Sequence, residues 1–193
     1  KDTLRYRIGV ATYSVGVAYN NRKTSLQFIQ QEMNNITALS NETCQLGIQS
    51  RNMVLYIAKK DSPQPIRLMS SVGKQLPLYC TGLGRALLAY KSEEEIRSLF
   101  PEVLTAYTPH TIATINDLLK ELELTRQRGY AVEHEETNLM VNCIAVSLDY
   151  NNAPIAALSI SIPTFRISES KEKEAVQILW EAKQRIETHF KMY

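Results

Sequence analysis

The sequence predicts an α+β domain in which helices flank a central antiparallel sheet of about six strands. Apolar residues recur at helical spacing in long segments near both ends of the chain, and shorter alternating runs lie between them. Short turn sequences separate neighbouring alternating runs, which is typical of hairpins and therefore of an antiparallel sheet. With 193 residues, the chain is long enough for one well-packed core and an appended segment.

The first third of the chain predicts two helices followed by three strands. Residues 8–20 are apolar almost all round, so we expect a connector or oligomer helix, although their β-branched content is also compatible with a strand. Residues 24–40 begin with a capping box, and their apolar stripe is expected to lie on the sheet. Residues 44–49 and 53–60 are expected to pair as a hairpin, and residues 66–72 to form a third strand.

Capping and stop signals place the helices in the rest of the chain. Ser92 and Glu95 form a capping box. Thr114 is expected to cap a helix that Gly129 ends in a left-handed conformation. The predicted helices cover 85–90, 92–100, 115–128 and about 171–191, and the predicted strands cover 130–133, 143–148 and 155–162.

Two of these strands each carry one face of small side chains. The small face comprises Cys143, Ala145 and Ser147 on one strand and Ala157, Ser159 and Ser161 on the next. The opposite face comprises Ile144, Val146, Leu148, Leu158, Ile160 and Ile162. The large residues must be buried, whereas the small and polar face leaves room for a compact ligand. The alternative is that the small residues let a helix pack closely on the sheet.

The composition argues against several classes of protein. The 22 basic and 20 acidic residues give a net charge of +2, which argues against this chain binding a nucleic-acid backbone by itself. Cys44, Cys80 and Cys143 are too widely spaced for a disulfide framework or a CxxC metal site, so we expect reduced thiols in a cytoplasmic protein without a cofactor. No apolar run approaches the roughly 18 residues of a membrane span. Because Lys1 is not a methionine, we expect the beginning of the protein to be missing.

A rival, catalytic interpretation centres on Cys143. A thiolate beside the imidazole of His134 would attack a carbonyl carbon, so the alternative function is a cysteine-dependent hydrolase of small amides or esters. Nothing in the sequence supplies a third group to orient the imidazole. The acidic run 133–136 lacks metal-ligand spacing, because adjacent strand residues point to opposite faces, and a solvated loop is the favoured interpretation. We therefore expect no catalytic residue and no metal site.

Several ordered motifs resemble the effector-binding domain of IclR-type bacterial transcriptional regulators. They are LPLYCTGLGRALLAY at 76–90, TPHTI at 108–112, LTRQRGYAVEHEE at 124–136 and LSISIPTFRIS at 158–168. The resemblance implies a GAF-like or profilin-like fold. It also implies that residues 1–22 are the end of a wing and a linker or dimerisation helix, and that residues 23–193 are the effector-binding domain. A homodimer or tetramer would contact DNA through an N-terminal winged helix-turn-helix absent from this chain.

The resemblance further implies a pocket for a small organic effector, often a carboxylate. Gly82 and Leu83 match backbone N–H groups that meet the ligand at the start of a helix, where unpaired donors favour an anion. The implied polar floor comprises Cys143, Ser159 and Ser161, whose thiol and hydroxyls would donate to ligand oxygens. The implied apolar wall comprises Leu68, Met69 and Val141.

Two positions depart from the family pattern in the acidic loop. Glu133 stands where the family usually has aspartate, and its extra methylene would move the carboxylate. His134 also stands at a commonly acidic position. We therefore expect an effector different from the smallest 2-oxo acids, and a sensory domain that acts by shifting a population of conformations rather than by catalysis.

Overall fold

The computed structural model describes residues 9–21, 24–65 and 71–192. The elements are α1 (Val10–Asn21), α2 (Thr24–Ser40), β1 (Thr43–Ser50), β2 (Met53–Lys60), β3 (Gln75–Pro77), η1 (Leu78–Cys80), α3 (Gly82–Leu88), α4 (Glu93–Leu99), α5 (Ile115–Arg128), β4 (Ala131–His134), β5 (Val141–Tyr150), β6 (Ala153–Pro163), η2 (Thr164–Arg166) and α6 (Glu169–Met192). The predicted α+β class with a six-stranded antiparallel sheet is confirmed, since the strand order is β3-β2-β1-β6-β5-β4 and every pairing is antiparallel.

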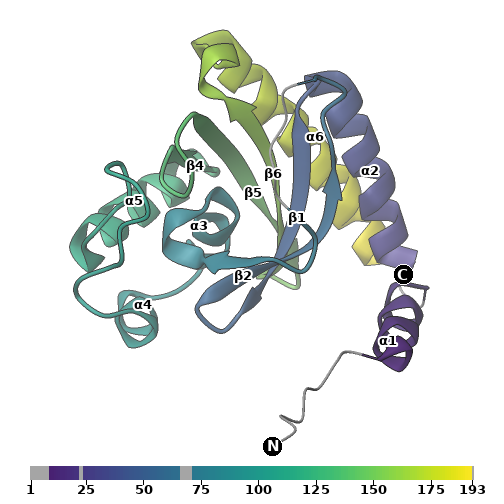
Figure 1. The fold of residues 1–193 in the computed structure, drawn as a ribbon, viewed down its shortest axis with the longest axis horizontal. Coiled ribbons are helices and arrows are strands. Elements are labelled where there is room, and N and C mark those ends of the chain that lie inside the picture. Colours follow the sequence, from purple (N-terminus) through teal and green to yellow (C-terminus); the bar gives the residue numbers. More distant parts are fainter. Residues whose placement is uncertain (1–8, 22–23, 66–70, 193) are drawn as a thin grey trace, which may run out of the picture.

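Helices cover both faces of the sheet, but in different ways. Helices α2 and α6 lie side by side along one face, whereas the short helix α3 lies over the other, with α5 beyond it (Figure 1). Helix α1 lies outside these layers, next to the start of α2 (Figure 1). The sheet therefore separates two hydrophobic cores, one under α2 and α6 and one around α3 and α5.

The alternation predicted for β5 and β6 decides which residues enter which core. Ile144, Val146, Leu148, Leu158, Ile160 and Ile162 are all buried in the core under α2 and α6. Ala145 and Ala157 are buried in the core on the α3 side. The register pairs Cys143 with Ser161 and Ala145 with Ser159, so the small residues of both strands share the α3 face. The predicted division into a large face and a small face is confirmed.

The helix ends follow the predicted signals closely. The Ser92 hydroxyl and the Glu95 carboxylate form a capping box around the start of α4. Thr114 caps α5 by accepting from the Asp117 N–H, and Gly129 ends that helix with φ 79°. The range 115–128 predicted for this helix is the observed one.

Two predicted elements differ from the structure. Most of the strand predicted at 66–72 lies outside the described residues, and the third strand observed is the short β3, which pairs with β2 after a turn at Gly73 with φ 87°. The helix predicted at 85–90 begins earlier, at Gly82, because the Thr81 side chain accepts from the Gly84 N–H and so caps the first turn. It ends at Leu88, before the predicted end.

Candidate functional site

A row of polar side chains crosses the α3 face of the sheet. The register places Glu133 of β4 opposite Cys143 of β5, and Cys143 opposite Ser161 of β6. The Cys143 Sγ lies 3.1 Å from the Ser161 Oγ. Ser161 donates to Gln45 Oε1 of β1 over 3.0 Å, and Ser159 donates to the same oxygen over 3.4 Å. Four neighbouring strands thus supply one continuous polar row on an otherwise apolar layer.

The proton directions along this row are partly determined. A serine hydroxyl has one proton, and Ser161 uses its proton on Gln45. The Cys143 side chain contacts both the Ser161 hydroxyl and the Glu133 carboxyl, so it links the two ends of the row.

The first turn of α3 lies directly over the row. A Cβ placed on Gly82 would come 3.3 Å from the Cys143 Cβ and 3.4 Å from the Ala145 Cβ, so this helix start touches the small face of β5. At position 84 only glycine fits, because a Cβ there would lie 2.2 Å from the Leu78 carbonyl oxygen. The Leu83 side chain packs beside Gly47 of β1. Both explanations of the small residues hold in part, since a helix packs closely and polar groups remain beside it.

The Glu133 carboxyl is buried at the end of the row, with its residue 1 % exposed. One oxygen, Oε1, accepts the backbone N–H groups of Glu136 and Thr137, over 2.5 and 3.2 Å. The longer glutamate side chain therefore reaches and holds the acidic loop. Burial raises the pKa of Glu133 from its ordinary 4.5 to about 7, although the Glu136 N–H favours the ionised form.

A buried ion pair beside the site was missed in the sequence. Arg85 of α3 is only 2 % exposed, and its guanidinium pairs with the Glu136 carboxylate. Its Nε and Nη1 donate to the carbonyls of Tyr79 and Val132, each over 2.9 Å, and Glu136 also accepts the Ile112 N–H over 3.1 Å. The expectation of a solvated acidic loop is wrong for Glu133 and Glu136, because backbone N–H groups and Arg85 compensate their burial.

Further titratable groups interact with this row. Burial raises the pKa of Tyr56, and the neighbouring Cys143, Glu133 and Cys80 raise it further. Burial also raises the pKa of Cys80 to about 12. Val54 and Tyr56 both face the α3 side by alternation, and a bulge between Tyr56 and Ala58 sends Ala58 to the opposite face. The simple alternation of the sequence does not predict that shift.

The structure brings together most of the residues expected to bind an effector. Gly82, Leu83, Glu133, Cys143, Ser159 and Ser161 surround the polar row and the start of α3, and Val141 lies on the same face of β5 at its first residue. Leu68 and Met69 lie outside the described residues. Gln45, Tyr56, Cys80 and Arg85 are the members that sequence reasoning missed.

The arrangement offers little support for a Cys143 nucleophile. His134 follows Glu133 on β4, so its side chain points to the face opposite to Glu133 and Cys143, and it is exposed. Burial and the Glu133 charge raise the pKa of the Cys143 thiol well above its ordinary value, which disfavours the reactive thiolate. Within the described ranges, no group of three or more His, Cys, Asp or Glu side chains is arranged to hold a metal ion.

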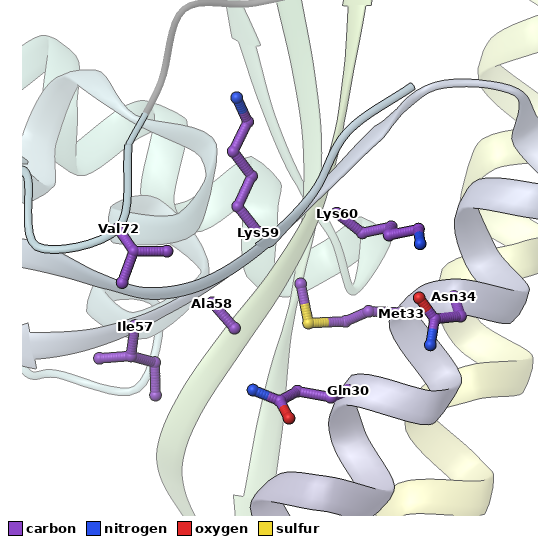
Figure 2. Close-up of a pocket in the computed structure, with 8 residues that line it drawn as sticks. All are labelled: Gln30, Met33, Asn34, Ile57, Ala58, Lys59, Lys60 and Val72. Atoms are coloured by element: carbon purple, nitrogen blue, oxygen red, sulfur yellow. The ribbon is translucent and has the colours of Figure 1, made fainter. Parts of the chain in front are cut away.

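A hollow of about 410 Å³ lies between α2 and β2. Figure 2 shows Gln30, Met33 and Asn34 reaching from α2 towards β2, with Val72 beside Ile57 at the other end. The amine of Lys59 bonds the Asp61 carboxylate, and the Met33 and Ala58 side chains belong to the core under α2 and α6. The hollow is an open groove rather than an enclosed site with converging polar groups.

In the part of the chain that the structure describes, no helix is both long and apolar enough to span a bilayer.

Comparisons with known proteins identify the family of this chain. The family model of the bacterial transcriptional regulator IclR C-terminal domain matches residues 18–188. The HTH-type transcriptional regulator KdgR of Dickeya chrysanthemi is 34 % identical over 187 residues, which are 96 % of this chain and 61 % of that protein. This chain therefore spans less than two thirds of that relative's length.

Two solved structures have the same fold. An IclR transcriptional regulator from Alicyclobacillus acidocaldarius is 28 % identical with a TM-score of 0.87, over 96 % of this chain and 76 % of that one. An IclR homologue from Microbacterium hydrocarbonoxydans, complexed with 4-hydroxybenzoate, is 23 % identical with a TM-score of 0.83, over 97 % of this chain and 76 % of that one. The chain belongs to the IclR family of bacterial transcriptional regulators, in which it corresponds to the C-terminal domain.

Proposed function

We propose that this chain is the ligand-sensing domain of a cytoplasmic transcription factor, and that it binds a small organic effector between the start of α3 and the polar row. The observation that carries the proposal is the row itself. Glu133, Cys143, Ser161 and Gln45 place carboxyl, thiol, hydroxyl and amide groups side by side inside an apolar layer. Buried polar groups in such a layer are costly, and a binding site is a reason to keep them.

The effector is a small carboxylate, bound by polar groups of the floor and by backbone N–H groups of Gly82 and Leu83. The Microbacterium homologue, which has this fold, is complexed with 4-hydroxybenzoate. The small side chains of the floor, Ala145 and Ala157, suit a compact molecule. Val141 at the start of β5, together with Leu68 and Met69, would supply the apolar wall.

The response is a shift between conformational states rather than a reaction. Residues 1–22 act as linker, residues 23–193 bind the effector, and a homodimer or tetramer conveys the change to DNA-binding domains in the part of the relatives that this chain does not span. A coupling free energy of about 1 to 3 kcal/mol between effector and DNA is enough for a useful response. The position of α1, next to α2 and outside the layers, supports a role for this helix in transmitting the movement.

A thermal-shift screen with small carboxylates tests this function. A ligand that binds only the folded chain should stabilise it by about 2.7 kcal/mol at one hundred times its dissociation constant, and so raise the melting temperature. The response should weaken in Ser161→Ala, which removes a floor hydroxyl, and should persist in Glu94→Gln, a matched control on the exposed side of α4. If no carboxylate changes the melting temperature, a sensory role for this site is wrong.

A turnover assay separates the sensor from the hydrolase. A sensor releases no product from small esters or amides, either as the parent chain or as Cys143→Ser, and the serine variant keeps part of the ligand response because a hydroxyl replaces the thiol donor. Product formation by the parent chain that disappears in Cys143→Ser would refute the sensory proposal.

A further inference from the structure

The Glu133 carboxyl is buried without a cation of its own. The guanidinium that the structure describes on this face belongs to Arg85, and its donors are used by the Glu136 carboxylate and by the carbonyls of Tyr79 and Val132. Glu133 relies instead on two backbone N–H groups, both bound to its Oε1. A hydrogen bond with the Cys143 side chain also joins the Glu133 carboxyl to the polar row.

The groups facing Glu133 act in opposite directions. Burial and the Glu136 carboxylate raise the pKa of Glu133, whereas the Cys143 side chain and the backbone N–H groups of Glu136 and Thr137 lower it. Four acidic groups, each neutral or negative, interact electrostatically with Glu133. They are Cys143 on β5, Tyr56 on β2, Cys80 in η1 and Glu136 in the loop. Arg85 is the positive group of the cluster, and Glu136 neutralises it. The pKa of Glu133, about 7, is consistent with a carboxyl that holds its proton near neutrality.

A carboxylate effector would bring a second negative charge into this enclosed site. Two carboxylates that share a buried site cannot both remain ionised at low cost, so one proton is retained between them. The floor serines hydrogen-bond Gln45, whereas a neutral Glu133 can offer a strong O–H donor to the anion. The proton comes from solvent, and no covalent bond forms or breaks apart from this O–H bond.

We propose that the effector is a small monocarboxylate that binds together with one proton, which is held between its carboxylate and the Glu133 carboxyl. This inference rests on the proposed function and adds the protonation state of the site to it. Effector sensing is then linked to pH through Glu133 as a specificity-determining residue. A neutral analogue, such as the amide of the same acid, binds without this linkage.

Isothermal titration calorimetry tests the inference directly. The probes are 2-oxo acids of about two to six carbons and 4-hydroxybenzoate, and each binder is titrated in two buffers that differ in ionisation enthalpy, from about pH 6 to about pH 9. Carboxylate binding should take up about half a proton near pH 7 and about one proton at higher pH. Well above pH 7, the dissociation constant should rise about tenfold per pH unit.

Variants identify the group that takes up the proton. In Glu133→Gln, an amide N–H replaces the acid proton and the amide oxygen can still accept the loop N–H groups, so affinity should be retained at high pH and proton uptake should vanish. His134→Gln is the matched control, because it changes the adjacent residue of the same strand, whose side chain points to the other face. It should keep the full proton uptake.

The outcomes separate this inference from the proposed function. Carboxylate binding without proton uptake, or with an uptake that survives Glu133→Gln, would overturn the proton-linked mechanism while leaving the sensory function intact. Failure of every probe to bind would overturn the sensory function itself. Equal proton uptake for an acid and its neutral amide would also overturn the mechanism, because the second carboxylate would then play no part.

Discussion

The two faces of β5 and β6 are built from alternating residues of the same strands, yet they differ in almost every physical property. On the side of α2 and α6, large aliphatic side chains are buried among other aliphatic side chains. On the side of α3, small and polar side chains form a hydrogen-bonded row that ends in a buried carboxyl. Leu158 and Ser159 are neighbours in the chain but belong to different cores.

This difference shows how one sheet can carry stability and recognition at once. Burial of an aliphatic side chain stabilises the fold by roughly 1.5 to 3 kcal/mol, so the α2 and α6 face is expected to supply the larger share of the stability. The polar face gains little from its hydrogen bonds, since each contributes about 1 kcal/mol net. Mutations on the two faces should therefore separate loss of folding from loss of binding.

Among these variants, Arg85→Ala should cause the largest loss in the free energy of unfolding. The polar face would then contain a structural group as well as groups for recognition. The substitution leaves the Glu136 carboxylate buried without its ion-pair partner, which costs about 3 to 5 kcal/mol. Urea denaturation followed by circular dichroism measures the loss. Lys120→Ala, which removes an exposed ion pair with Asp117, should cost less than about 1 kcal/mol. Similar losses for the two variants would contradict the structural role of Arg85.

Leu158→Ala tests the apolar face, with the next largest effect. The side chain is fully buried under α2 and α6, so its truncation should cost about 2 to 5 kcal/mol in the free energy of unfolding. The variant that still folds should bind effector with nearly unchanged affinity, because Leu158 points away from the row. A large loss of affinity with little loss of stability would show that the two faces are not separate in function.

The alternation that defines the two faces could be predicted from the sequence, because its period of two extends without interruption along residues 143–148 and 157–162. The capped helices could be predicted for a similar reason, since capping residues act on their immediate neighbours. Such local signals were sufficient for the fold class and for the floor of the candidate site.

The missed residues depend on contacts that are distant in the sequence. Alternation alone would place Val54, Tyr56 and Ala58 on one face, but a bulge in β2 leaves Tyr56 on the α3 face and moves Ala58 to the other. Arg85 is buried because carbonyls of Tyr79 and Val132 and the carboxylate of Glu136 meet its guanidinium, and two of those three partners are about fifty residues away. No local pattern distinguishes this arginine from one on an exposed helix face.

The free energy of unfolding should depend on pH through Glu133. Because its pKa is raised from 4.5 to about 7, the effect is up to about 3 kcal/mol. Below pH 4.5 the folded and unfolded chains both hold the proton, and this contribution is fully present. Between pH 4.5 and about pH 7 only the folded chain holds the Glu133 proton. This stabilising contribution is therefore lost as the pH rises through about 7. Urea denaturation at a series of pH values measures the decline.

Glu133→Gln should flatten this profile, because the amide does not ionise, whereas Glu94→Gln on exposed α4 should leave it unchanged. A stability that stays constant between about pH 5 and about pH 8 in the parent chain would mean that Glu133 is already ionised in the folded state.

Ser161→Ala should have the smallest effect on stability and a clear effect on recognition. The hydroxyl bonds Gln45 and the Cys143 thiol, so its loss should cost about 0.5 to 1.5 kcal/mol in the free energy of unfolding. Ser159→Ala should cost less, since its bond to Gln45 is longer, at 3.4 Å. Effector affinity measured by calorimetry should fall more for Ser161→Ala than for Leu158→Ala, although the order of their stability losses is reversed. That inversion would distinguish a recognition face from a second structural core, in which binding and stability would decline together.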